Sequence, residues 1–241
     1  MTTHAPAVDP DGPCDTRMMG IIHSALRRDL VRTRMVLDDP ALLTDARRVG
    51  LADHVLWLMH ALHTHHHGED IGLYPMVLRN DPSTRALVED MDRDHQRIDP
   101  AIGDLEAAAR AYREDPDGRE GLLAALAGLD AVLLPHLERE EVVMMPVVSG
   151  CVTQREWDDW NQEINVRPKG VLYLAEEGHY VLDNLDDVSR ALVVELVPPV
   201  PRFVIIKLLG GKYRRKRALL WDGTPAERVP SLSLDLVQAW R

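Results

Sequence analysis

The feature that most constrains the fold of this chain is an internal repeat of a histidine and glutamate pattern. The stretch HHHGEDIGLYPMV begins at His65, and HLEREEVVMMPVV begins at His136. Both read His-x-x-x-Glu followed by an acidic residue and, further on, Pro-x-Val, and 136 minus 65 places them 71 residues apart. A lone histidine precedes each copy, His23 and His95, and 95 minus 23 gives a separation of 72 residues. Matched spacings of this kind predict two αα-hairpins built on one plan.

Turn signals divide the first 150 residues into four pieces of helical length. Asp-Pro sequences stand at 39–40, 81–82 and 115–116, and such clusters of Asp, Asn, Pro and Gly mark turns. Apolar residues recur at helical spacing in the pieces between them, which span residues 16–38, 42–79, 83–114 and 118–149. Short connections make neighbouring helices antiparallel, so we expect an all-α, up-down-up-down four-helix bundle over residues 16–150. Pro100 should kink the third helix, and Pro75 and Pro146 could do the same near the ends of the second and fourth.

The remaining residues, 151–241, predict a helical extension that packs on the bundle. We expect helices over 154–166, 180–196 and 202–221, with the sequence PPVP at 198–201 as a rigid break. Apolar residues between Val204 and Leu209 should pack on the bundle, and the basic run KYRRKR at 212–217 should face water. An acidic partner or a membrane surface is the alternative explanation of that run.

Composition and charge exclude several classes of protein. The net charge of −11 disfavours nonspecific nucleic-acid binding, although residues 200–241 hold nine Lys/Arg against three Asp/Glu. Two cysteines, Cys14 and Cys151, are too few for a disulfide framework, and we expect ordinary thiols, with one bond between them as the alternative. Neither a signal sequence nor a membrane-spanning run is evident, so a cytoplasmic location is expected.

Helical geometry separates the histidines of the second helix into two faces. With 100° of rotation per residue, Glu69 lies about 40° and His66 about 100° from His65, on the same stripe as the apolar core residues. Asp70, His63 and His67 fall about 140° to 200° from His65, so they should point outward. The same count places His136 and Glu140 on the leucine face of the fourth helix.

Histidine and glutamate on a leucine-rich inner face require a partner, because burying unpaired polar groups is costly. A single inward histidine is usually a hydrogen-bonded core residue, but two matched sets favour metal ligation. The expected ligands are His23, His65, Glu69, His95, His136 and Glu140, with His66 as a seventh candidate. Mixed nitrogen and oxygen ligands suit two bridged iron or manganese ions. His54 should be structural, while His60, His63 and His67 should lie on the surface. The lone Glu176-x-x-His179 does not provide the repeated motif of ferritin-like di-iron proteins.

These residues resemble the hemerythrin-like, or HHE cation-binding, family. The matching pieces are IHSALRR from Ile22, HHHGEDIGLYP from His65, Asp94-His95 and HLEREE from His136. The resemblance implies a four-helix bundle around a non-haem di-iron centre, Fe2+/Fe3+ with an oxo or hydroxo bridge. The six residues above would hold it, with His66 as a seventh candidate. Two departures stand out: Met91 occupies the place of a further histidine in oxygen-carrying relatives, and the fourth helix carries His-x-x-x-Glu rather than His-x-x-x-x-Asp. Simple oxygen carriage is therefore not the expected role.

Three functions are compatible with such a site. The first is a centre that binds O2, peroxide or NO, with catalase-like decomposition of peroxide as the expected reaction. The second is an iron or oxygen sensor, in which metal occupancy orders the chain and residues 151–241 transmit the signal. The third is oxidation of an organic substrate in a pocket that the C-terminal residues help to form. Arg27, one turn after His23, could pair with a ligand carboxylate or a bound anion, or be a solvated arginine at the bundle end.

Overall fold

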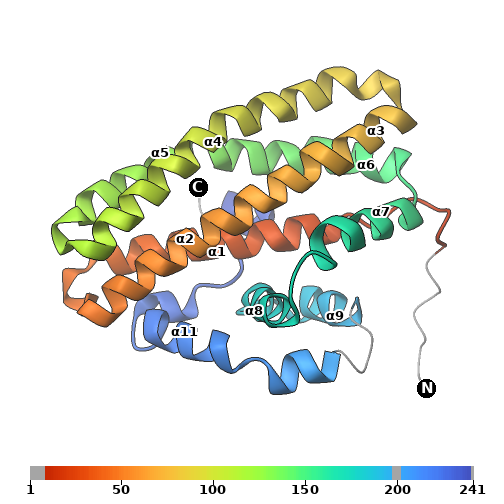
Figure 1. The fold of residues 1–241 in the computed structure, drawn as a ribbon. Coiled ribbons are helices and arrows are strands. Elements are labelled where there is room, and N and C mark those ends of the chain that lie inside the picture. The colour runs from red at the N-terminus through yellow and green to blue at the C-terminus, as the bar shows by residue number, and fades with distance from the viewer. Residues whose placement is uncertain (1–8, 197–201, 240–241) are drawn as a thin grey trace.

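The fold is a four-helix bundle with further helices packed along one side of it (Figure 1). It was obtained as a computed structural model, which describes residues 9–196 and 202–239. Within that part of the chain there is no β-strand, only an isolated bridge between Pro13 and Thr153. The first bundle helix is α1 (Arg17–Asp38), and the third is α4 (Arg85–Glu114). The second is continuous through α2 (Asp45–Gly68), η2 (Glu69–Leu73) and α3 (Tyr74–Asn80). The fourth is continuous through α5 (Arg119–Arg139), η5 (Glu140–Met144) and α6 (Met145–Cys151). The predicted all-α bundle is confirmed.

Asp-Pro sequences make each of the three connections in the bundle. They form the short 3-10 turns η1 (Pro40–Leu42), η3 (Pro82–Thr84) and η4 (Pro116–Gly118). In each turn the preceding aspartate accepts a hydrogen bond from the backbone N–H two residues later, at 3.0 Å for Asp39, 3.0 Å for Asp81 and 2.9 Å for Asp115. These side chains satisfy backbone groups that the helix ends leave unpaired, so the turn is encoded locally.

Prolines within the bundle helices have two different effects. Helix α4 runs through Pro100 as one element. Pro75 and Pro146 instead follow the wide π-helical turns η2 and η5, in which the N–H of Tyr74 bonds to Glu69 O and that of Met145 to Glu140 O. A proline ring collides with the carbonyl four residues before it, and a wider turn relieves that collision. The helix therefore changes pitch, without ending, directly at the two repeated glutamates.

Two apolar clusters fill the bundle, one on each side of a polar layer. The larger contains Leu26, Leu58, Ile98 and Leu133 among its buried residues. The smaller lies beyond the polar layer and includes residues such as Met91 and others from the ends of the same helices. On the second and third bundle helices, the histidines and Glu69 fall between the stretches that supply the two clusters, and on the fourth helix Glu140 does so. The packing thus isolates this polar layer from the surrounding solvent.

The C-terminal helices partly differ from those predicted. They are α7 (Gln154–Trp160), η6 (Asn161–Val166), α8 (Val171–Leu182), α9 (Asp187–Glu195), η7 (Val204–Leu208), α11 (Gly211–Trp221), η8 (Pro225–Arg228) and α12 (Leu234–Ala239). The helix predicted over 154–166 is present. The single helix predicted over 180–196 is wrong. Helix α8 ends at Leu182, Asn184 has a left-handed backbone with φ 48°, and Asp186 caps the new helix α9. The predicted helix over 202–221 is interrupted near Gly210, and the proline-rich 198–201 lies outside the described residues.

The basic run was predicted to face water, but part of it packs inside the molecule. Lys212 and Lys216 pair with the carboxylate of Glu176 at 2.6 Å and 3.2 Å, and Arg217 pairs with Asp183 at 3.0 Å. The side chain of Lys212 is nevertheless 72% exposed, and Arg214 and Arg215 are exposed, so part of the run faces water as predicted and part is paired within the chain.

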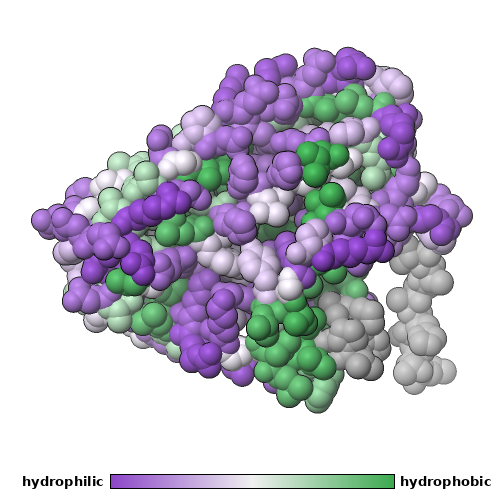
Figure 2. Space-filling model, viewed as in Figure 1, coloured by the Kyte–Doolittle hydropathy of each residue, from purple (hydrophilic) through white to green (hydrophobic). Residues whose placement is uncertain are grey.

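The apolar residues before the basic run are only partly covered. Of the residues predicted to pack on the bundle, Val204, Ile205 and Leu209 are half-buried, whereas Leu208 is 64% exposed. Figure 2 shows apolar surface over this part of the fold. The side chain of Ile206 lies outside the described residues. Hydrophobic periodicity did not identify the inward face of this region. The basic residues that follow it pair with Glu176 and Asp183, and such pairing between distant residues leaves no local pattern in the sequence.

One stretch, Pro116–Cys151, is long and apolar enough to cross a membrane by length and composition, with a mean hydropathy of 1.4 in its most apolar window. The core helix of a bundle passes the same test, and this one supplies Leu122, Leu126 and Leu129 to the core. The absence of a membrane-spanning segment therefore stays a prediction. Cys14 and Cys151 are both free thiols.

Candidate metal centre

All four bundle helices contribute to one polar layer, and every predicted ligand lies in it. The seven residues are His23 from α1, His65 and His66 from α2, Glu69 from η2, His95 from α4, His136 from α5 and Glu140 from η5. All are buried except His65, whose side chain retains 13% exposure. His66 was placed at the edge of the inner stripe, yet it is only 2% exposed and stacks on the ring of His95 with a centroid distance of 4.1 Å.

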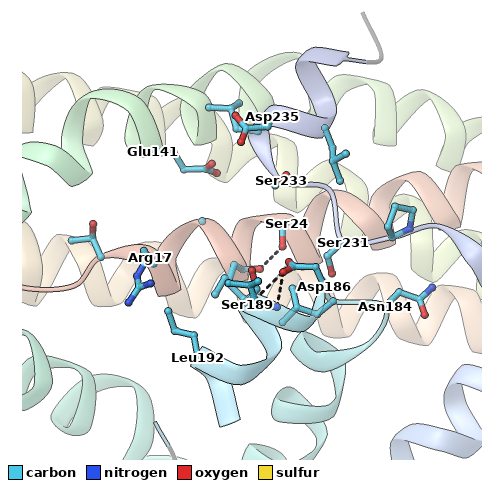
Figure 3. A pocket seen from close by; sticks show the side chains of 18 of the residues that line it. Arg17, Ser24, Glu141, Asn184, Asp186, Ser189, Leu192, Ser231, Ser233 and Asp235 are labelled. Carbon is cyan, nitrogen blue, oxygen red and sulfur yellow. Dashed lines mark hydrogen bonds between the residues drawn. The ribbon is translucent and has the colours of Figure 1, made fainter. Parts of the chain in front are cut away.

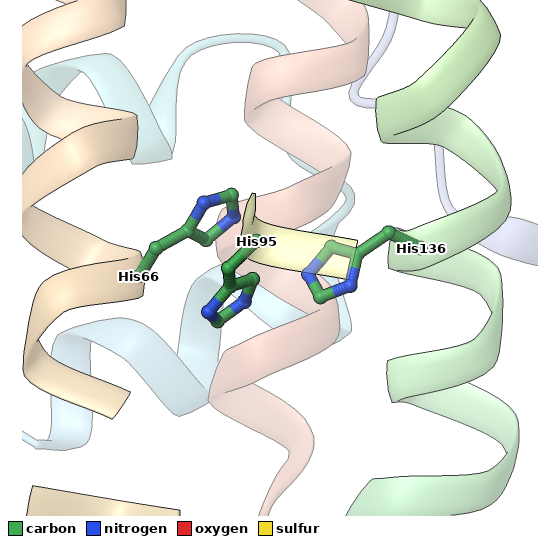
Figure 4. Close-up of side chains that lie close together, drawn as sticks. All are labelled: His66, His95 and His136. Carbon is green, nitrogen blue, oxygen red and sulfur yellow. The ribbon is translucent and has the colours of Figure 1, made fainter. Parts of the chain in front are cut away.

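The imidazoles fall into two groups that could each hold a metal ion. His66, His95 and His136 form one group, drawn in Figure 4, and His23, His65 and Glu140 form the other. Within each group the candidate ligand atoms lie within 4.8 Å of one another. The three residues of each group come from three different helices of the bundle, so each group forms only when the bundle is packed.

The two glutamates lie between these groups. Glu69 places Oε1 3.1 Å from His65 Nε2 and Oε2 3.6 Å from His95 Nε2. Glu140 Oε2 lies 3.4 Å from His23 Nε2 and 3.7 Å from His136 Nε2. Each carboxylate therefore reaches one histidine of each group, which is the arrangement that carboxylates bridging two adjacent cations require.

Many polar atoms in this layer have no hydrogen-bond partner within the described chain. They are both oxygens of Glu69, Oε2 of Glu140, both ring nitrogens of His66 and of His136, and Nε2 of His95. A buried polar atom left unpaired costs about 1–3 kcal/mol. So many in one place would be strongly destabilising without a bound species, and cations that accept nitrogen and oxygen ligands fit this set. Tyr74 donates to the layer, with its hydroxyl 3.4 Å from Glu140 Oε1, and the Nε2 atoms of His23 and His65 lie 3.3 Å apart.

Burial lowers the pKa values of three of these histidines and raises that of Glu69. Loss of solvation lowers the pKa of His65 and His66 well below the ordinary value and that of His136 to about 2. These imidazoles are therefore neutral and offer lone pairs. Loss of solvation and the nearby Glu140 raise the pKa of Glu69 well above its usual range. A cation in the layer would remove that penalty and favour the carboxylate.

A second repeated pair of carboxylates orients two of the histidines. Asp70 Oδ1 lies 2.7 Å from His95 Nδ1, and Glu141 Oε1 lies 2.9 Å from His23 Nδ1. Subtracting 70 from 141 gives the same 71-residue spacing as the repeat. Such contacts fix the Nδ1–H tautomer and turn Nε2 toward the site.

These contacts correct the sequence analysis. Asp70 was predicted to point outward, and its side chain is 36% exposed, but its Oδ1 also reaches Nδ1 of His95, a contact that the turn count did not predict. Glu141 was missed, although the acidic residue after each repeated glutamate was the available signal.

Arg27 extends the contact around His23. Its Nη2 lies 2.7 Å from Glu141 Oε1, and the residue is only 3% exposed, so it is not a solvated arginine. Loss of solvation alone would raise the pKa of Glu141, but the hydrogen bond from His23 and the charges beside it hold that pKa below its ordinary value. The chain from Arg27 through Glu141 to His23 therefore carries an ionised carboxylate.

The other histidines among the described residues lie away from this layer. His54 bonds to Asp29 at 2.8 Å and is buried, so it is structural as predicted. His60, His63 and His67 are exposed, also as predicted. His179 contacts the carbonyl of Ile205 at 3.1 Å, and Glu176 pairs with lysines, so that pair forms no site.

The C-terminal residues pack directly on the first copy of the repeat. Trp160 donates from Nε1 to Gly68 O at 3.0 Å. A Cβ at Gly72 would lie 2.5 Å from Trp160 Cδ1, and one at Gly68 would lie 2.7 Å from Ile164 Cγ2. The two glycines in HHHGEDIG thus allow α7 and η6 to approach the helix that carries the ligands.

Comparison with known proteins gives one result for this chain. The model of the family described as the hemerythrin HHE cation binding domain matches residues 15–149. Neither the search of curated proteins nor that of solved structures found a match. The matched residues are those of the bundle and end where the C-terminal helices begin.

Proposed function

The chain belongs to the hemerythrin HHE cation-binding family, and on that premise we propose that its polar layer holds two iron ions. The observation that carries the proposal is the position of Glu69 and Glu140, each between two histidine groups, with unpaired buried oxygens. His66, His95 and His136 would hold one ion, and His23 and His65 the other, with both glutamates shared. Manganese accepts the same ligands and is the alternative metal.

The two positions are unequal, which bears on where a small molecule would bind. One has three histidines and the other two, because the residue equivalent to His66 in the second copy, at 66 plus 71, is Leu137. The position beside His23 and His65 therefore has one protein ligand fewer. We propose that O2, hydrogen peroxide or NO is accommodated on that side.

Iron pairs supply redox chemistry toward such molecules, and we propose decomposition of hydrogen peroxide as the reaction. The residues of the chain prepare the site for it. Glu141 and Asp70 hold two imidazoles in one tautomer and orientation, and Tyr74 donates to Glu140. The apolar clusters on both sides exclude water, which strengthens the electrostatic interactions within the layer.

A sensor is the second candidate, and one contact favours it. The indole of Trp160 bonds to Gly68 O, two residues after His66. Filling or emptying the site would change the order of the ligand-bearing helix, and this contact would pass the change to the C-terminal helices.

The test combines metal analysis, an optical spectrum and peroxide addition on the same full-length sample. We expect about two irons per chain, an absorption band from the iron pair, and oxygen release on adding hydrogen peroxide. His65→Ala should remove all three, whereas the control His67→Ala, at an exposed neighbouring position, should keep them. Iron without oxygen release would favour the sensor. A folded protein that takes up no iron would contradict the proposal.

A further inference from the structure

A cavity of about 660 Å³ lies between the start of α1 and the C-terminal helices α9 and α12 (Figure 3). This volume falls within the range of small-molecule sites in proteins, about 300–1,000 Å³. One wall comes from the bundle, through α1 and η5, and the other from residues beyond 183. The cavity is therefore completed only when the C-terminal helices pack on the bundle.

Its lining combines apolar surface with carboxylates. Ile21, Met145, Leu185 and Leu192 provide apolar walls. Glu141, Asp186 and Asp235 also line it, and the one cation in the lining, Arg17, is paired with Asp15 at 2.5 Å. Glu141 is itself paired with Arg27 at 2.7 Å, and Asp186 Oδ1 accepts hydrogen bonds from the backbone N–H groups at the start of α9. The excess negative charge therefore comes from Asp186 and Asp235, which have no ion pair within the described residues. An apolar cavity with excess negative charge selects ligands that are apolar and positively charged.

Gly20 exposes one of these carboxylates to the cavity. A Cβ at this position would lie 3.7 Å from Glu141 Oε2, an ordinary contact distance, so the glycine is not required by crowding. A larger side chain would extend over the carboxylate. While Oε1 of Glu141 contacts His23 and Arg27, Oε2 remains on the side of Gly20 and the cavity.

We propose that this cavity binds a small organic amine, with its apolar body against Met145 and Leu192 and its ammonium group among Glu141, Asp186 and Asp235. The carboxylate of Glu141 would then lie between the ligand and His23. The inference goes beyond the proposed iron chemistry and does not depend on it, because none of the seven proposed metal ligands lines the cavity.

The test uses full-length protein with labelled methionine methyl groups and three probes of equal length: hexylamine, hexanoate and hexanol. Met145 lines the cavity and is 4% exposed, so its methyl resonance reports occupancy in metal-free samples, in which no paramagnetic iron broadens it. We expect saturable shifts with hexylamine, and affinities at least about tenfold weaker for hexanoate, a difference that electrostatic selection of this kind supplies. Hexanol should fall between them.

Variants separate binding in the cavity from binding elsewhere. Leu192→Trp should fill the cavity and weaken hexylamine at least about tenfold, while Leu172→Trp, at a position 68% exposed on α8, should not change it. Asp235→Lys is a surface change that the fold tolerates and should remove the preference for the amine. Equal binding of hexylamine and hexanoate, or no saturation at Met145, would overturn the proposal. Loss of iron binding with intact amine binding would contradict only the proposed function.

Discussion

Replacing His66 by leucine tests whether the polar layer is built for metal or for packing. Leucine already stands at the equivalent position of the second copy, Leu137, which is fully buried. His66 is buried with both nitrogens unpaired, and its ring stacks on His95. The substitution therefore removes two unsatisfied polar atoms and one candidate ligand while nearly conserving volume.

The expected effect on the free energy of unfolding is smaller with iron bound than without it. Without metal, removing buried unsatisfied nitrogen atoms should raise the free energy of unfolding by about 1–3 kcal/mol. With iron bound, losing a ligand should weaken metal affinity at least about tenfold, which removes about 1.4 kcal/mol of the stabilisation that the metal contributes. The iron-loaded variant should therefore gain less from its metal than the original protein does.

The assay is urea unfolding followed by circular dichroism, on chelator-treated and iron-loaded protein, with metal content measured on the same samples. His67→Leu is the matched control, because His67 is the exposed neighbour in the same helix and should change either value by no more than about 0.5 kcal/mol. Equal destabilisation of both forms by His66→Leu would refute the reasoning, since it would make His66 a packing residue.

Three further predictions concern the surroundings of the site. Glu141→Gln and Asp70→Asn should each weaken metal affinity by about 10–100-fold in competition with a chelator, because they remove the carboxylates that orient His23 and His95; unchanged affinity would contradict that role. Gly72→Ala should destabilise by about 1–3 kcal/mol through collision with Trp160, whereas Gly103→Ala, with open space around it, should stabilise by about 0.5–1 kcal/mol. Loss of solvation lowers the pKa of His54 from 6.5 to about 4, so its contribution to stability is present above pH 6.5 and is lost as the pH falls from 6.5 toward 4; a histidine NMR titration that finds protonation near 6.5 would contradict this.

The sequence predicts those parts of the structure that are encoded locally or by repetition. In the Asp-Pro turns the aspartate accepts a hydrogen bond from a backbone N–H two residues later, so the turn is encoded locally. In the bundle, the ligand positions predicted for one copy of the repeat could be compared with those of the other copy. The turn count did not place Asp70 and Glu141 beside the histidines, because it assumes α-helix where η2 and η5 widen; the only signal for these contacts was the acidic residue that follows each repeated glutamate. The C-terminal helices had no second copy to check them. Their positions depend on buried ion pairs such as Arg32 with Asp183, which join residues far apart in the sequence.

The places where the two copies differ show where the C-terminal helices pack. Adding 71 to Gly68 and Gly72 gives Arg139 and Val143, so the glycines are not part of the repeated plan. Trp160 and Ile164 cover the glycines in the first copy, whereas in the second copy the side chain of Arg139 is 42% exposed and Val143 is 45% exposed.

Glycine within a helix costs about 0.5–1 kcal/mol relative to alanine, so its presence needs a compensating contact. The close approach of the indole to Gly72 and its hydrogen bond to Gly68 O supply that contact. A helix with alanine at both positions would keep its ligands but would hold α7 and η6 further away. The glycines therefore specify the docking of the C-terminal helices on the ligand-bearing helix, and the repeated histidines and glutamates specify the site itself.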